Sequence, residues 1–129
     1  FAFDSREESD YLPHNYEKNC VVYTGTHDND TLCGWYKVLD PDDLKLSQKY
    51  MNNANTPKRQ IHWDFIRLAL ASVADLCIIP LQDYLGLGSE ARINTPSTLG
   101  NNWRWRMTQG CLTKELADQI RELTTLYGR

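Results

Sequence analysis

Two short apolar runs stand out along this chain of 129 residues, at 20–24 (CVVYT) and 76–81 (LCIIPL). Neither run alternates between apolar and polar positions, so each is typical of a strand buried on both faces, as in a parallel sheet covered by helices. We therefore predict two buried strands. Pro80 should end the pairing of the second strand, because proline lacks the amide hydrogen that a sheet requires.

Three other segments have the pattern of helices. Residues 40–52 start with Asp40 as a cap and a proline in the first helical position, and they end in a stretch rich in asparagine. Residues 58–74 repeat apolar side chains over a broad arc, as in a helix that packs on a sheet. Residues 113–127 begin with Thr113 as a cap. Their apolar face carries these side chains: Leu116, Ile120, Leu123 and Tyr127.

The predicted order is strand, helices, strand, long loop and helix, which indicates an α/β fold with a parallel sheet. The long loop, residues 82–106, is rich in glycine, and loops of this length in compact domains usually have a function. Polar residues follow both strands at their carboxyl ends, where active sites lie in parallel α/β folds. No repeat divides the chain, so residues 1–129 are treated as a single segment of one domain.

The charge and the composition of the chain argue against several classes of partner. The net charge is −3 and the pI is about 5.5, so the chain lacks the basic surface of a nucleic-acid-binding protein. No apolar run approaches the ~20 residues that cross a bilayer, so we expect no membrane partner. The four cysteines are too far apart for a zinc knuckle, and we interpret them as reduced thiols. We predict neither a metal nor a cofactor.

The amino-terminal sequence FAFDSREESD has neither the basic nor the apolar region of a signal peptide. It also lacks a methionine and begins on an apolar run. We therefore expect a piece of a longer protein, with its first residue inside a former strand.

A cluster of ligand-type side chains, THDND, follows the first predicted strand. One interpretation is a solvated acidic loop in which Asn29 or Asp30 caps a helix that begins at TLCGWY. A calcium loop is a weaker alternative, because the glycine and the later glutamate of an EF-hand are missing. The third interpretation is a carbohydrate site. A carboxylate (Asp28) beside a neutral imidazole (His27) can bind two sugar hydroxyls in a fixed geometry and stabilise an oxocarbenium-like centre.

The long loop contains further candidates, each with an ordinary structural alternative. Glu90 and Arg92 are expected to form a structural ion pair. Trp103 and Trp105 alternate with arginines. Each indole is either part of the core or a stacking surface for a sugar, and a core position is the simpler interpretation.

Four sequence blocks are YLPHNY, VVYTGTHDNDT with GWY, QDYLGLGSEARIN and GNNWRWR. In this order they resemble the 4-alpha-glucanotransferases, the amylomaltase or disproportionating-enzyme family (glycoside hydrolase family 77). The resemblance implies the carboxyl-terminal part of a (β/α)8 TIM barrel, about its last two βα units, which is an incomplete barrel by itself. It also implies a cytoplasmic enzyme, or a plastid enzyme if the source is a plant.

The implied reaction is transfer, with retention, of an α-1,4-glucan segment to the 4-hydroxyl of an acceptor glucan or glucose. An aspartate nucleophile and a glutamate acid/base form and resolve a covalent glycosyl-enzyme in this family, and the resemblance places both before the first residue. Asp28 matches the third catalytic carboxylate, which stabilises the transition state. His27 and Asn94 match residues that bind the substrate, and Phe1 resembles an aromatic residue near the acceptor. The implied partners are α-1,4-glucans such as maltooligosaccharides, starch and glycogen.

Two alternatives stand beside the transferase. A non-catalytic carbohydrate-binding module would use Trp103, Trp105 and Tyr36 as platforms, but such modules are usually β-sandwiches, and the predicted helices oppose that fold. A hydrolase of the amylase type shares the carboxylates and differs in whether water or a glucan resolves the intermediate. Because two strands cannot close a barrel, we expect the isolated chain either to self-associate through exposed apolar surface or to repack, and to be inactive alone.

Overall fold

A computed structural model describes residues 2–6 and 8–129. Within them, β1 (Val21–Tyr23) and β2 (Leu76–Ile78) pair in parallel. Both strands lie inside the apolar runs that predicted them, and the parallel pairing confirms the α/β class of fold. β2 ends before Pro80, as predicted, and this proline instead caps the next helix.

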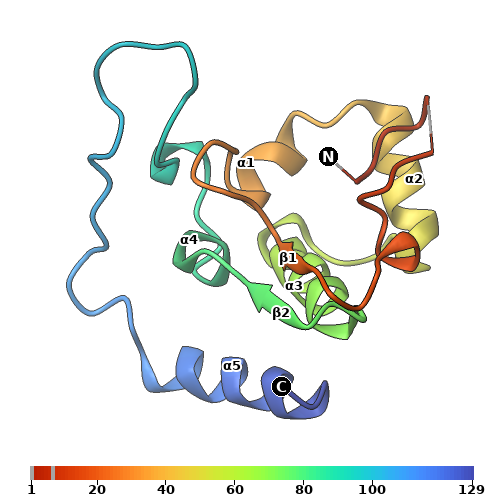
Figure 1. Ribbon diagram of the computed structural model, residues 1–129. Coiled ribbons are helices and arrows are strands. Elements are labelled where there is room, and N and C mark those ends of the chain that lie inside the picture. The colour runs from red at the N-terminus through yellow and green to blue at the C-terminus, as the bar shows by residue number, and fades with distance from the viewer. Residues whose placement is uncertain (1, 7) are drawn as a thin grey trace.

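Both strands are covered on one face only, which corrects the prediction of strands buried on both faces. Val22 of β1 is 5% exposed and packs with Ala69 and Ala74 on the side of α3 (Ile61–Ala71), which lies behind the sheet in Figure 1. The opposite face, called here the open sheet face, has four apolar side chains that are 41–52% exposed: Val21, Tyr23, Leu76 and Ile78. No element of the described residues buries them, so they remain in contact with solvent.

α3 forms the centre of the core and is shorter than the helix predicted at 58–74. It ends at Ala71 because Ser72 has extended backbone dihedrals. The guanidinium of Arg129 donates to three carbonyls at this end, those of Leu70, Ser72 and Ala74. The early end leaves Val73 58% exposed, although the predicted helix continued to residue 74.

The two helices predicted from their end signals are confirmed. In α2 (Pro41–Met51), Asp40 caps the first turn, and Asn52 ends the helix in a left-handed conformation with φ of 51°. In α5 (Lys114–Leu126), the Thr113 hydroxyl accepts a hydrogen bond from the third amide that follows it. The predicted apolar face of α5 packs against the core: Leu116, Ile120, Leu123 and Tyr127.

An aromatic cluster joins α3 to the helices before it. Phe3 is 7% exposed and contacts the rings of Trp35 in α1 (Leu32–Lys37) and Tyr50 in α2. It also meets the ring of Phe65 on α3 edge to face, with 5.7 Å between the ring centroids. Such aromatic contacts bury large apolar areas. They anchor α1, whose amino-terminal end follows the candidate site.

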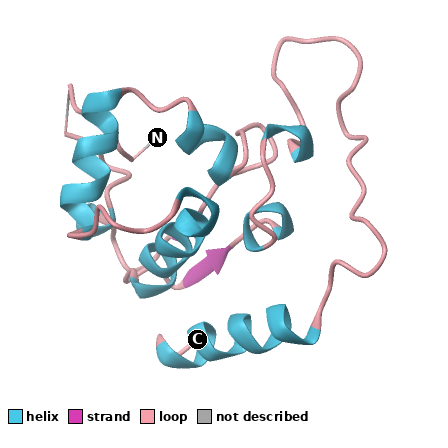
Figure 2. Ribbon diagram, turned by 180° about the vertical axis from the view of Figure 1, so that it is seen from behind, coloured by secondary structure: helices cyan, strands magenta, loops and turns pink. Residues whose placement is uncertain are grey.

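The long loop predicted at 82–106 is partly helical. It contains η3 (Ser89–Ala91), and α4 (Leu81–Tyr84) begins just before it. From residue 92 to 113 the chain has no helix or strand, and it runs away from the body of the molecule before it returns as α5 (Figures 1 and 2). The remaining 3-10 turns are η1 (Pro13–Asn15) and η2 (Lys58–Gln60).

Candidate functional site

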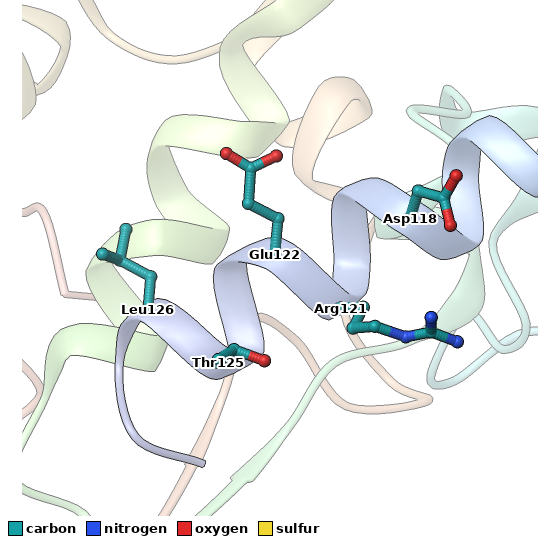
Figure 3. A pocket seen from close by; sticks show the side chains of 5 residues that line it. All are labelled: Asp118, Arg121, Glu122, Thr125 and Leu126. Carbon is teal, nitrogen blue, oxygen red and sulfur yellow. The ribbon is translucent and has the colours of Figure 1, made fainter.

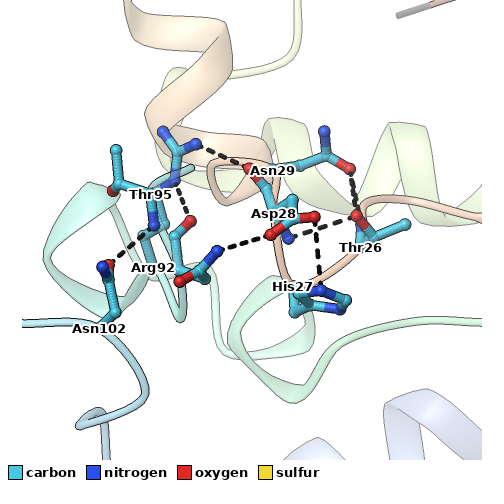
Figure 4. Close-up of polar contacts among 8 residues, drawn as sticks. Thr26, His27, Asp28, Asn29, Arg92, Thr95 and Asn102 are labelled. Carbon is cyan, nitrogen blue, oxygen red and sulfur yellow. Dashed lines mark hydrogen bonds and ion pairs between the residues drawn. The ribbon is translucent and has the colours of Figure 1, made fainter. Parts of the chain in front are cut away.

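The candidate site is centred on residues 24–31, which connect β1 to α1 at the carboxyl end of the strand (Figure 4). The Asn29 Oδ1 atom accepts hydrogen bonds from the amide and the hydroxyl of Thr26 at 2.8 and 3.0 Å. The Thr26 hydroxyl oxygen accepts in turn from the amide of Asp28 at 3.3 Å. These bonds close the loop into a turn. The side chains of His27 and Asp28 remain 52% and 48% exposed.

The cap of α1 is Thr31, which corrects the interpretation that Asn29 or Asp30 has this role. The Thr31 hydroxyl accepts a hydrogen bond from the amide of Gly34 at 3.1 Å. Asp30 instead accepts from the hydroxyl of Ser89 at 2.7 Å and so joins the loop to η3. A Cβ atom on Gly34 would come within 2.6 Å of the Asp30 carboxylate, so this close approach requires glycine.

Asp83 holds the base of the loop. This carboxylate belongs to α4 and is 2% exposed. One of its oxygens accepts a hydrogen bond from the amide of Leu32 at 2.8 Å, and the other accepts from the hydroxyl of Thr24 at 2.6 Å. The two donors lie at opposite ends of the loop, so a single side chain fixes both ends. Burial raises the pKa of Asp83, and the two hydrogen bonds oppose this shift.

The segment that follows η3 contacts this loop. The contacts involve three residues to which the family resemblance assigned a role: His27, Asp28 and Asn94. The side-chain amide of Asn94 donates to Asp28 Oδ1 at 2.7 Å, and its backbone amide donates to the His27 carbonyl at 3.1 Å. His27 Nε2 lies 3.4 Å from the other Asp28 oxygen, and this contact is an ion pair only when the imidazole is protonated. The fold thus brings together Asp28 and Asn94, which are 66 positions apart. Phe1 lies outside the described residues.

Arg92 has a different role from the one predicted. The expected ion pair with Glu90 is not found in residues 8–129, where Glu90 accepts a hydrogen bond from the amide of Gly88 at 3.0 Å. Arg92 instead donates from Nε to the carbonyl of Asn94 at 2.9 Å and from Nη2 to the carbonyl of Asp28 at 2.7 Å. The sequence contained no signal for these bonds, because one of the two carbonyls lies 64 positions away.

Trp103 lies at the site and not in the core, contrary to the simpler interpretation. Its side chain is 59% exposed, and its ring centroid is 5.0 Å from that of His27. The backbone amide of Trp103 donates to the carbonyl of Ile93 at 2.7 Å. Its φ of 61° lies in the left-handed region, which is rare for a bulky residue. This conformation breaks the extended course that the alternation of tryptophan and arginine suggested.

A hollow of about 380 Å³ lies beside the loop at the carboxyl ends of β1 and β2. Its lining includes two residues of the open sheet face, Tyr23 and Ile78, together with His27, Asp83 and Arg92. Polar donors and acceptors at the edge of an apolar surface suit a sugar, because its hydroxyls need hydrogen bonds and its CH groups need apolar contact.

No group of three or more side chains placed to hold a metal ion occurs in residues 2–6 and 8–129. Their helices are too short or too polar to cross a membrane. A hollow on α5 is lined by side chains of that helix alone, as Figure 3 shows: Asp118, Arg121, Glu122, Thr125 and Leu126.

Parallel strands backed by a helix, with a carboxylate, an imidazole and an amide at their carboxyl ends, define an α/β protein with a site suited to a carbohydrate. The chain belongs to the 4-alpha-glucanotransferase family, glycoside hydrolase family 77, whose sequence profile matches residues 1–113.

Individual relatives agree with this assignment. The chain is 48% identical over 130 residues to a 4-alpha-glucanotransferase of Clostridium butyricum, in an alignment that covers all of this chain and 26% of that protein. It is 46% identical over 132 residues to the chloroplastic/amyloplastic 4-alpha-glucanotransferase of Arabidopsis thaliana, again over all of this chain and 23% of that protein.

A solved structure agrees as well, that of the amylomaltase from Streptococcus agalactiae in complex with acarbose. The TM-score is 0.90 at 35% identity, over 98% of this chain and 25% of that chain. The chain therefore spans about a quarter of the length of the relatives it matches.

Proposed function

We propose that these residues form part of the active site of a 4-alpha-glucanotransferase, which transfers an α-1,4-glucan segment to the 4-hydroxyl of an acceptor glucan or glucose. The observation that carries the proposal is the 2.7 Å hydrogen bond between Asn94 and the Asp28 carboxylate, at the carboxyl ends of the parallel strands. This bond joins two sequence blocks of the family in one site. The family assignment and the similarity to an amylomaltase support the reaction class.

Asp28 is the transition-state-stabilising carboxylate in this proposal. Retaining glycosidases of this type pass through an oxocarbenium-like transition state and need a separate nucleophile and acid/base. One Asp28 oxygen is held by Asn94 and the other faces His27, while the side chain is 48% exposed. The negative charge is thus fixed before the reaction begins. A fixed charge stabilises developing positive charge without the cost of reorganisation.

His27 and Asn94 are proposed to bind the same sugar. A side-chain amide has two N–H donors and one acceptor, so Asn94 can hold Asp28 with one N–H and offer its other groups to hydroxyls. His27 is 52% exposed and lies next to the Asp28 carboxylate, which lets it contact a neighbouring hydroxyl. Phe1 is proposed to contact the acceptor on the strength of the resemblance.

We further infer that β1 and β2 are part of a (β/α)8 barrel whose other strands lie elsewhere in the full-length protein. The exposed apolar side chains of the open sheet face support this, because strand side chains fill the interior of such barrels while the helices form the outer ring. α3 would then lie on the outside. The nucleophile and the acid/base would come from the other strands, so the 129-residue chain alone should release no glucose from maltotriose.

The proposal predicts that Asp28→Asn removes most of the turnover of the full-length protein that contains these residues. We expect kcat for glucose release from maltotriose to fall by about 10²-fold or more, as when one preorganised group is removed from an active site. The change in KM should be much smaller. Asp118→Asn is a matched control, because this carboxylate on α5 is 52% exposed, close to the value for Asp28. Near-normal turnover of Asp28→Asn would show that the assigned role is wrong.

Analysis of the products separates a transferase from an amylase-type hydrolase, since both would use the same carboxylates. With maltotriose as both donor and acceptor, a transferase yields maltooligosaccharides longer than the substrate together with glucose, whereas a hydrolase yields only shorter ones. The family match favours transfer. A carbohydrate-binding module is not favoured, because such modules are usually β-sandwiches and this fold is built on helices such as α3 and α5.

A further inference from the structure

We propose that Arg92 is a positioning residue for the transfer reaction, because its guanidinium sets Asp28 and Asn94 relative to each other. The inference rests on the proposed function, in which both of these residues face the substrate. Arg92 acts through the two residues whose backbone it holds.

One guanidinium connects the two segments of the site (Figure 4). Its Nη2 donates to the backbone carbonyl of Asp28 at 2.7 Å, and its Nε donates to the backbone carbonyl of Asn94 at 2.9 Å. The same two residues are joined directly by the 2.7 Å bond from Asn94 Nδ2 to Asp28 Oδ1. The three bonds close a ring. Arg92 fixes the backbone of both partners, and the bond between their side chains follows from that fixed backbone.

Arginine is suited to this task for a geometric reason. Its planar guanidinium presents several N–H donors in a rigid fork, so two acceptors bound to it have a defined separation. The carbonyls of Asp28 and Asn94 belong to loops, which without this contact would bond to water and move more freely. If the side chain had no such fork, the separation of these two carbonyls would be set only by two flexible loops.

The contacts of Arg92 are made to the site and not to the core. Arg92 lines the hollow beside the loop, and Asp28, which it holds, is 48% exposed. Both hydrogen bonds of its guanidinium go to backbone carbonyls of the site, those of Asp28 and Asn94. Loss of the guanidinium should therefore loosen the site and leave the packing of α1, α3 and α5 intact.

The first test is Arg92→Met in the full-length protein, because methionine keeps an unbranched apolar stem and removes all the donors. We expect kcat for transfer from maltotriose to fall about 10²-fold, the effect of misplacing a reacting group by about 1 Å. KM should change much less, and the thermal unfolding midpoint should shift by only a few degrees. Arg121→Met, at an exposed position on α5, is the matched control and should keep wild-type kinetics.

The second test is chemical rescue of Arg92→Ala. Free guanidinium ion added to the reaction should raise kcat of this variant severalfold, because it can occupy the space and bond to the same carbonyls. The same ion should not raise kcat of the wild type or of Asp28→Asn.

Three results would overturn the inference. The first is a kcat for Arg92→Met within about twofold of the wild type. The second is loss of the folded state in both Arg92 variants, which would make Arg92 a structural residue. The third is a wild-type protein without transfer activity, which would overturn the proposed function and this inference together. If the wild type transfers normally and Arg92→Met keeps its kcat, only this inference is overturned and the proposed function stands.

Discussion

Burial shifts the pKa of two side chains, Asp83 and His62. Asp83 accepts hydrogen bonds from both ends of the site loop, and each donor left without it would cost about 1–3 kcal/mol. His62, on α3, is 5% exposed, and its Nδ1 has no hydrogen-bond partner among the described residues. Its ring lies against Gly86, where a Cβ atom would come within 2.7 Å. Burial lowers the pKa of His62, and the nearby Asp64 carboxylate opposes that shift.

The lowered pKa of His62 should make the protein less stable in mild acid. Because its folded pKa lies below the ordinary value of 6.5, the unfolded chain takes up this proton more readily than the folded chain. The resulting contribution to the free energy of unfolding is complete above pH 6.5, and it is lost as the pH falls through the folded pKa. We expect His62→Phe to remove this part of the decline in the free energy of unfolding at low pH, measured by urea unfolding at several pH values. His14→Phe, at an exposed position, should retain it, and an unchanged decline in His62→Phe would contradict the prediction.

At the scale of elements, α1 is held by its contacts and not by its own helix propensity. It has six residues, and isolated helices of that length do not form in water. Thr31 caps it, and Gly34 allows the Asp30–Ser89 hydrogen bond to lie directly against the helix. Because the site loop ends where α1 begins, the packing of α1 against η3 fixes the carboxyl-terminal end of that loop.

Gly34→Ala tests this packing. Alanine favours a helix over glycine by about 1 kcal/mol, but its Cβ would lie 2.6 Å from the Asp30 carboxylate. Overpacking costs about 1–3 kcal/mol, so we expect a net loss of up to about 2 kcal/mol and a lower urea midpoint. Gly25→Ala is the control, because a Cβ there would make an ordinary contact of 3.5 Å with Asn29. A Gly34→Ala variant as stable as the wild type would show that α1 is free to shift.

At the scale of the whole molecule, one face of the two-stranded sheet is covered and the other is not. α3 buries Val22, while the open sheet face leaves four apolar side chains 41–52% exposed. Both strands also lie at an edge, because the sheet has no others within the described residues. Exposed strand edges and apolar patches promote association between chains.

We therefore expect the 129-residue chain to self-associate in solution, as sedimentation velocity can measure. Leu76→Lys, on the open sheet face, should shift the distribution toward the monomer, because it places a charge in the apolar contact. Leu99→Lys is the matched control, since Leu99 is fully exposed in the connection before α5. A compact monomer at all concentrations, or equal effects of the two variants, would contradict this prediction.

The sequence by itself determined the features that act over a few residues. Asp40, Asn52 and Thr113 begin or end their helices through bonds to nearby backbone groups, so the local pattern of residues is enough to predict them. The same holds for Pro80 at the end of β2. The sequence blocks of the family also indicated which loops contain the candidate site.

Only the tertiary structure decided which distant segments of the chain contact one another. It brings Asn94 to Asp28 across 66 positions and lets Arg92 hold both, where sequence reasoning had paired Arg92 with Glu90. It also places Trp103 against His27 and leaves one face of the sheet open. The physical reason is common to all of these. Each contact joins residues that are far apart in the sequence, and burial is a property of neighbours that a local pattern does not contain.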